Sequence, residues 1–231
     1  MDNILEVSSL TKKYKNFTAL DNFSMSVPRG SIYGFVGNNG AGKTTLIRLV
    51  CGLQTPTSGD IKLDVSGKNI GAVVETPSIY LDMTAKDNLK QQYRLLGIKD
   101  FSSIDDLLKL VGLENTGKKK AKNFSLGMRQ RLGIAVALCG DPEFLILDEP
   151  VNGLDPQGII EVRELLIKLS REKGMTILIS SHILDELSKL ATHYGFISNG
   201  RMIREMSAED LGAYESLEDF YVSLIGGADH E

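Results

Sequence analysis

The sequence predicts an α/β domain built on a mainly parallel β-sheet with helices on both faces. Mainly apolar runs at residues 31–36, 144–147 and 175–180 have the length of buried strands, and helical patterns separate them. Strands buried on both faces are typical of parallel sheets, because the crossover helices cover both sides. A helical stretch from residue 84 to about residue 140 interrupts this alternation, so we expect an inserted α-helical subdomain.

The N-terminal segment predicts a small antiparallel β subdomain. Residues 4–8 and 19–28 alternate or run apolar, with turn-forming residues between them, which is typical of paired strands. We expect a single domain, because the chain shows no internal repeat and no low-complexity linker. Its core would comprise residues 1–75 and 141–231, and its inserted arm residues 76–140.

The remaining elements follow in chain order. Short strands are expected at residues 59–63 and 70–74, before the arm. Pro156 suits the first turn of a helix, which we expect to run to about Lys173. Short strands and helical segments alternate in the tail, at residues 193–198, 201–205, 207–213 and 216–225.

Length and composition are ordinary for a globular protein with its own core. The chain has 231 residues, of which 42% are hydrophobic and 24% charged, and its net charge of −4 gives no field that favours nucleic acid. Cys51 and Cys139 are expected to be buried thiols rather than a disulfide. No apolar run approaches the ~18 residues that span a bilayer, and the N-terminus lacks the features of a signal peptide. We therefore expect a cytoplasmic chain that reaches a membrane only through other subunits.

One glycine-rich segment predicts a binding site for a nucleoside triphosphate. Residues 37–44 match G-x-x-x-x-G-K-[ST] and stand between a predicted strand and a predicted helix, which is the context that the phosphate-binding loop requires. Lys43 should reach the β- and γ-phosphates, and the Thr44 hydroxyl should ligate Mg²⁺. The alternative is a glycine-rich turn that happens to precede a helix. The candidate nucleotide-binding residues of this segment are Gly37, Asn38, Asn39, Gly40, Ala41, Gly42, Lys43, Thr44 and Thr45.

Asp148 and Glu149 form a second candidate group, at the end of an apolar strand. A carboxylate at the carboxyl end of a parallel strand lies where ligands bind in such sheets. We expect Asp148 to hold Mg²⁺ through water and Glu149 to accept a proton from the attacking water. The alternative is an ordinary acidic turn after a strand.

The segment Phe124–Leu132 carries a family resemblance. It resembles the signature of the ATP-binding subunits of ABC transporters, which runs Leu-Ser-Gly-Gly-Gln into a helix, whereas Leu126 and Met128 depart from that pattern. Read alone, the segment is a serine N-cap followed by an amphipathic helix. The resemblance implies a P-loop NTPase core, with Ser125 and Gly127 as candidate nucleotide contacts. The positions that keep the pattern are Ser125, Gly127, Gln130 and Arg131.

The resemblance spans about residues 3–225 and implies roles for three more positions. Tyr14 stands where the family has an aromatic that stacks on adenine, although an aromatic that packs on the core is the alternative. Residues 152–155 look like the D-loop at the subunit boundary, which makes Asp155 a candidate nucleotide contact. His182 looks like the switch histidine that contacts the γ-phosphate, whereas a lone histidine after a strand would otherwise carry no functional meaning.

Glu75 is the main departure from the family pattern. The family usually has a glutamine there, which ligates Mg²⁺ and connects the core to the arm. A carboxylate could bind the ion more strongly and would act in catalysis, and its alternative is a solvated loop residue. A glutamate here, together with the segment 124–132, looks like the subgroup that serves lantibiotic immunity and bacitracin-type resistance.

The resemblance also implies partners. The signature faces the nucleotide of a second subunit, so two chains would form a homodimer that buries two ATP molecules. Membrane-spanning permease subunits would bear on the arm at residues 77–83, and no nucleic-acid partner is expected. The basic run at residues 118–122 is interpreted as a solvated loop, with contact to acidic headgroups as the alternative.

These features predict the ATPase subunit of a bacterial ABC exporter that hydrolyses MgATP, with antimicrobial-peptide immunity or resistance as the favoured task. One alternative is the same ATPase serving another export substrate, such as a drug, lipid or ion. A second is a non-transport ABC protein that acts on nucleic acid or the ribosome, and a third is a plain P-loop kinase. The non-transport relatives typically carry two cassettes, long coiled coils or zinc modules, which this sequence does not show.

Overall fold

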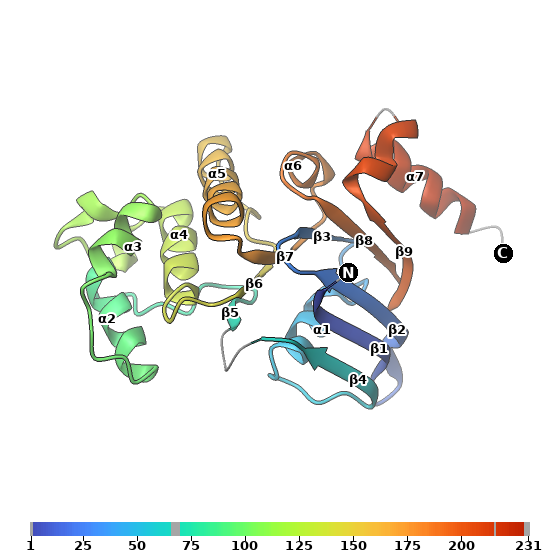
Figure 1. Ribbon diagram of the computed structural model, residues 1–231, viewed down its shortest axis with the longest axis horizontal. Helices are drawn as coiled ribbons and strands as arrows, with labels where there is room; N and C mark the ends of the chain where they lie inside the picture. Colours follow the sequence, from blue (N-terminus) through green and yellow to red (C-terminus); the bar gives the residue numbers. More distant parts are fainter. Residues whose placement is uncertain (1, 66–69, 215, 229–231) are drawn as a thin grey trace. The chain divides into compact units, whose positions relative to one another are not determined.

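The computed structural model describes residues 2–65, 70–214 and 216–228 (Figure 1). The chain divides into two compact units, one formed by residues 1–64 and 176–231 and the other by residues 65–175. We call them the loop unit and the arm unit. The predicted division into a core and an arm of residues 76–140 places its boundaries elsewhere and stays a prediction.

The loop unit contains an antiparallel sheet, as expected for the N-terminal segment. Its strands β1 (Asn3–Tyr14), β2 (Phe17–Pro28) and β4 (Ser58–Leu63) follow the order β2-β1-β4, with both pairs antiparallel. Figure 1 shows α1 (Lys43–Val50) beside these strands. Both predicted N-terminal strands are confirmed, and each is longer than the sequence indicated.

The loop unit also contains parallel strands. β3 (Ile32–Val36) lies between β7 (Thr176–Ser181) and β8 (His193–Ser198) and is parallel to both. Every residue of β3 and β7 is buried, which explains why both read as continuous apolar runs. Burial of each large apolar side chain contributes about 1.5–3 kcal/mol to folding, so these strands form a stable platform.

The end of the chain adds elements to the same platform. β9 (Arg201–Ser207) pairs antiparallel with β8, and a 3₁₀ turn at Ala208–Ala213 leads to α7 (Leu217–Ala228). A short helix, α6 (Leu184–Ser188), was not predicted, because it is too short for apolar periodicity to appear.

The arm unit contains two parallel strands, four α-helices and two 3₁₀ turns (Glu114–Thr116 and Ala121–Asn123) among its described residues. β5 (Ile70–Val73) pairs with β6 (Phe144–Asp148), and the helices are α2 (Ala85–Leu95), α3 (Ile104–Leu110), α4 (Leu126–Ala137) and α5 (Pro156–Lys173). The α5 bounds match the prediction, because proline occupies the first turn and Gly174 ends the helix in a left-handed conformation. No helix in the described part of the chain is long and apolar enough to cross a bilayer.

Two glycines allow close packing inside the arm unit. A Cβ atom on Gly133 of α4 would lie 2.5 Å from the Cβ atom of Pro77, and one on Gly71 of β5 would lie 2.3 Å from the carbonyl oxygen of Ala137. Real Cβ atoms essentially never approach so closely, so neither position accepts a side chain without movement. The segment after β5 is therefore packed directly on the α4 helix.

Candidate functional site

The phosphate loop leaves β3 and enters α1 as the motif predicts. Gly37 is buried, and a Cβ atom there would lie 2.6 Å from the Ile197 side chain. Gly42 has φ of +113°, and its Cβ atom would lie 2.7 Å from the Ala19 carbonyl oxygen. Both ends of the loop therefore require glycine, while residues 38–40 between them are exposed and open to a ligand.

Lys43 is held inside the loop. Its side chain is 5% exposed, and its Nζ donates to the carbonyl oxygens of Gly37 at 2.6 Å and Asn38 at 3.2 Å. Thr44 and Thr45 are half-buried in the first turn of α1, where helix geometry and the dipole favour an anion. The loop thus offers a positive group and a helix N-terminus at one exposed turn.

Two other predicted residues of the loop unit are accessible. Tyr14, at the end of β1, is 38% exposed; its hydroxyl donates to Gln54 Oε1, and Lys12 Nζ lies 5.0 Å from its ring centre. An exposed ring suits stacking better than core packing. His182 is exposed directly after β7, at a turn in which the Ile183 amide donates to Ser181 Oγ at 2.9 Å.

The arm unit places carboxylates after two paired strands. Val73 of β5 stands opposite Leu147 of β6, and Glu75 and Glu149 each follow two residues later. Both glutamates have positive φ, 60° for Glu75 and 50° for Glu149, which is uncommon for residues other than glycine. Asp148, which ends β6, is 2% exposed. Left-handed backbone at two neighbouring strand ends is the kind of local strain found at functional sites.

Ser125 and Asp155 both serve as helix caps. Ser125 Oγ accepts a hydrogen bond from the Met128 amide at 3.2 Å, and Asp155 Oδ1 accepts one from the Gly158 amide at 3.1 Å. Each side chain satisfies an amide that the helix itself leaves without a partner. The signature and the D-loop are neighbours, because a Cβ atom on Gly153 would lie 3.4 Å from Leu126. Gly127 is buried at the start of α4.

Arg131 fixes the signature helix to its surroundings. Its guanidinium donates to the Val111 carbonyl at 3.0 Å, beyond α3, and forms an ion pair with Glu161 of α5 at 3.1 Å. The arginine side chain is only 14% exposed, so the interaction is screened less than a surface pair. Arg131 is one of the residues that keep the signature pattern. Its partners follow α3 and lie on α5, so its role is to position the α4 helix and not to serve the exposed turn at Ser125.

The predicted site residues thus form two groups, each inside one unit. The loop unit holds the phosphate loop, Tyr14 and His182, and the arm unit holds Glu75, Asp148–Glu149, the signature and the D-loop. Sequence reasoning missed Gln54, which accepts a hydrogen bond from Tyr14, and it missed Gly200 and Tyr221, which contact the phosphate loop. These residues belong to no motif, and only folding brings them beside their partners.

Comparisons with known proteins identify relatives. The profile described as ABC transporter matches residues 20–152. The chain is 46% identical over 222 residues to the bacitracin transport ATP-binding protein BcrA of Bacillus licheniformis, covering 91% of this chain and 72% of that protein. It is 43% identical over 228 residues to the lantibiotic transport ATP-binding protein SrtF of Streptococcus pyogenes, covering 96% and 97%. The solved structure of cbiO1 from Clostridium perfringens, part of the ABC transporter complex cbiONQ, superposes with a TM-score of 0.82 at 30% identity, covering 97% and 96%.

Proposed function

We propose that this chain, which belongs to the ABC transporter family as an ATP-binding and ATP-hydrolysing subunit, drives the export of a lantibiotic or bacitracin-type peptide and so protects its cell. The observation that carries the proposal is a complete phosphate loop, with Lys43 held inside it, in a chain 46% identical to a bacitracin transport protein. Glu75, in place of the usual glutamine, supports the same subgroup.

Each unit by itself offers groups that suit part of MgATP. Hard oxygen ligands suit Mg²⁺, and the chain offers the half-buried Thr44 hydroxyl, the buried carboxylate of Asp148 and the carboxylate of Glu75. When bound, the ion would offset part of the phosphate charge. Lys43 would exchange its two loop carbonyls for phosphate oxygens, so its ammonium stays hydrogen-bonded throughout. Tyr14 would stack on the base.

The reaction transfers the γ-phosphoryl group to water. The water oxygen forms a bond to the γ-phosphorus, the bond to the β,γ-bridging oxygen breaks, and ADP leaves. Glu149 would take the proton of the attacking water, and its left-handed backbone, directly after buried Asp148, sets where its carboxylate can reach. Lys43 and His182 would stabilise charge on the transferred group.

We infer that two copies share each nucleotide. Ser125 and the exposed turn at the start of α4 would meet the γ-phosphate on the loop of the twin copy, at a helix N-terminus that favours anions. Asp155, beside the signature, would lie at the subunit boundary. Such a two-fold contact closes with ATP and opens after hydrolysis, because the phosphates no longer bridge the copies.

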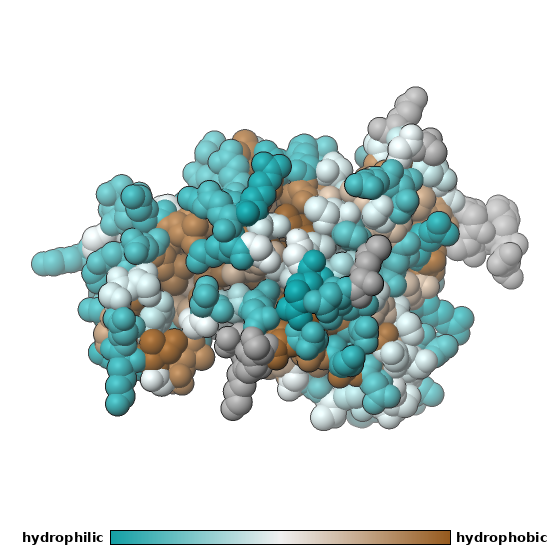
Figure 2. Space-filling view, in the orientation of Figure 1, coloured by the Kyte–Doolittle hydropathy of each residue, from teal (hydrophilic) through white to brown (hydrophobic). Residues whose placement is uncertain are grey.

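Membrane-spanning permease subunits would receive this motion on the arm unit. Within residues 77–83, Tyr80 is 48% exposed and Leu81 is 46% exposed, and Figure 2 shows apolar surface over the helices of this unit. The segment is hydrogen-bonded to the 3₁₀ turn that precedes the signature, because the Ala121 amide donates to the Met83 carbonyl at 2.9 Å and the Lys122 amide to the Leu81 carbonyl at 2.8 Å. A displacement of residues 77–83 by the permease would therefore be passed to Lys122 and on to Ser125, which follows Lys122 by three residues.

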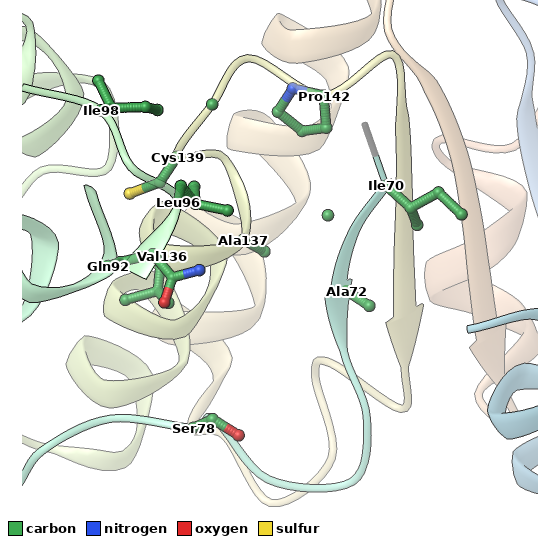
Figure 3. Close-up of a pocket in the computed structure, with 12 residues that line it drawn as sticks. Ile70, Ala72, Ser78, Gln92, Leu96, Ile98, Val136, Ala137, Cys139 and Pro142 are labelled. Carbon is green, nitrogen blue, oxygen red and sulfur yellow. The ribbon is translucent and has the colours of Figure 1, made fainter. Parts of the chain in front are cut away.

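A cavity of about 540 Å³ lies in the same unit. Figure 3 shows Ile70 and Ala72 of β5 on one side, Leu96 and Cys139 on the other, and Ser78 near one end. Apolar residues line most of it and Ser78 and Gln92 add polar groups, a mixture that suits a short amphipathic segment of a permease. We propose that the permease bears on this cavity and on residues 77–83 together. The chain would then be held at the inner face of the cell membrane.

The test uses a peptide-sensitive bacterium that carries the chain with the permease genes found beside it. We expect the wild-type chain to raise tolerance to bacitracin or to a nisin-type lantibiotic, and Lys43→Ala to abolish that protection while still co-purifying with the permease. If the chain has normal ATPase activity but protects against neither peptide, the ATPase serves another export substrate. Equal protection by Lys43→Ala would show that ATP does not drive it.

A further inference from the structure

The C-terminal part of the chain touches the phosphate loop at two points. The first is the turn between β8 and β9, where the Gly200 amide donates to the Ala41 carbonyl at 2.9 Å. This turn is itself fixed, because the Asp21 amide donates to the Gly200 carbonyl at 3.0 Å. Gly200 has φ of +75°, and a Cβ atom there would lie 2.7 Å from the Ala19 carbonyl oxygen, so the contact requires glycine.

The second point is Tyr221 on α7. Its hydroxyl donates to Asn38 Oδ1 at 3.3 Å, a long hydrogen bond between the last helix and the exposed part of the loop. Burial raises the pKa of Tyr221, and a hydrogen bond with the Asn38 backbone partly opposes that rise. The hydroxyl therefore stays protonated and able to donate at neutral pH.

Aromatic packing sets the position of α7. Phe196 of β8 lies 5.1 Å from Phe220 and 6.0 Å from Tyr221, ring centre to ring centre, and it is stacked on Tyr221 at 27°. Phe196 stands opposite Val36, the residue before the loop begins. The ring that anchors the helix thus lies in register with the start of the loop, and Figure 1 shows α7 beside β8 and β9.

Fixing Asn38 and Ala41 restrains the whole loop. The Asn38 carbonyl accepts from Lys43 Nζ at 3.2 Å and from the Ala41 amide at 3.1 Å, so it closes the turn and holds the lysine. Gly40 and Gly42 have positive φ and give the loop much freedom to lose when phosphate binds. Contacts that remove part of that freedom beforehand lower the cost of binding.

We propose that α7 is a brace for the phosphate loop and that Tyr221 is a positioning residue for nucleotide binding. Its hydroxyl acts through Asn38 and holds the loop in the shape that receives phosphate. The proposal rests on the proposed function only in that the loop binds a nucleotide. It adds that the end of the chain, outside every recognised motif, sets nucleotide affinity.

The test is Tyr221→Phe in the full chain, which keeps the ring on Phe196 and removes only the hydroxyl. The matched control is Tyr214→Phe, whose ring packs edge-on against Phe220 at 4.9 Å and whose side chain is 44% exposed. We expect Tyr221→Phe to raise the Kd for a fluorescent ATP analogue and the KM for MgATP about two- to fivefold, the worth of one long hydrogen bond. Its kcat should stay within about twofold of wild type, and Tyr214→Phe should match wild type throughout.

A double-mutant cycle with Asn38→Ala separates positioning from general loosening. If the hydroxyl acts through Asn38, Tyr221→Phe has a smaller effect on Kd in the Asn38→Ala background, which keeps only the contact with the Asn38 backbone. An unchanged Kd for Tyr221→Phe, an effect that is undiminished without the Asn38 side chain, or an equal fall in kcat and in thermal stability would each overturn the brace. A wild-type chain that binds no nucleotide would overturn both proposals, whereas failure to protect against peptides would overturn only the proposed function.

Discussion

The phosphate loop and the carboxylates of the arm unit are built in opposite ways. The loop is one continuous run of sequence, and at its two ends a side chain would collide with Ile197 and with the Ala19 carbonyl oxygen, so both ends require glycine. Glu75 and Glu149 are far apart in sequence and are neighbours only because β5 pairs with β6. A binding loop can therefore be recognised from adjacent residues, whereas bringing the two proposed catalytic carboxylates to one edge depends on strand pairing.

The two regions also differ in how their functional side chains are held. Lys43 is buried and hydrogen-bonded to its own loop, so its ammonium group is already positioned for phosphate before a nucleotide binds. In the arm unit, left-handed backbone determines the direction in which the side chains of Glu75 and Glu149 leave the chain. The Ser125 hydroxyl already accepts a hydrogen bond from the Met128 amide as a helix cap. We infer that the loop unit mainly binds the nucleotide. The arm unit would carry the groups that act on the bound nucleotide and change position with it.

Glu149→Gln should produce the largest effect. Removing the proton acceptor should lower the ATPase rate by about 10²–10⁴-fold, while leaving the loop unit and its affinity for ATP intact. An ATP-bound dimer should then accumulate, because hydrolysis no longer opens it. Size-exclusion chromatography in excess MgATP measures the dimer, and turnover is measured on the same sample.

Lys43→Ala is the matched control for Glu149→Gln, since it removes the phosphate-binding ammonium and leaves the proposed proton acceptor in place. It should lose nucleotide affinity and form no ATP-dependent dimer. A Glu149→Gln protein that stays monomeric in excess MgATP would contradict the shared site, and one that turns over normally would remove Glu149 from the reaction.

Each unit carries one cysteine, and the two should differ strongly in reactivity. Cys139, in the arm unit, is 7% exposed, and burial raises its pKa from 9.0 to about 12. At mildly alkaline pH its thiolate fraction should be roughly 10³-fold lower than that of an ordinary thiol, and the thiolate is the reactive form. Cys51, at the end of α1, is half-buried. Peptide mass spectrometry after brief alkylation should find Cys51 modified first, and early labelling of Cys139 would show that the arm unit opens.

Gly133→Ala should weaken the contact between the Glu75 segment and the signature helix. The new methyl group would lie 2.5 Å from Pro77, an overpacking that costs about 1–3 kcal/mol, offset by about 1 kcal/mol of improved helix propensity. The net loss, about 0–2 kcal/mol, is measured by denaturant unfolding. We also expect permease-stimulated ATPase activity to fall more than basal activity, because Pro77 would shift.

The control for Gly133→Ala is Gly212→Ala, where a Cβ atom would meet no atom within 4 Å. It should leave stability and stimulation unchanged. If both variants lose stimulation equally, the contact with Pro77 does not carry the coupling.

The sequence predicted the elements that are long or carry a motif, and it missed what depends on distant contacts. The phosphate loop, the α5 helix and the buried β7 strand follow from local pattern, because proline, glycine and apolar runs act on their own neighbours. The short α6 helix lacks a full apolar period. The contact of Tyr221 with Asn38 needs α7 to fold back on Phe196, which no local pattern specifies.

Glu75→Gln should have the smallest effect and the most specific one. The substitution keeps the length of the side chain and removes one negative charge, so ATP binding at the loop should be unchanged. If the Glu75 carboxylate ligates Mg²⁺, the Mg²⁺ concentration that half-activates the ATPase should rise about two- to tenfold, because a neutral carbonyl is a weaker ligand than a carboxylate. A magnesium titration at saturating ATP measures this, and the matched control is Glu114→Gln, an exposed carboxylate of the same unit in a 3₁₀ turn. Equal titrations, together with unchanged transport, would reduce Glu75 to a solvated residue whose left-handed backbone alone shapes the turn after β5.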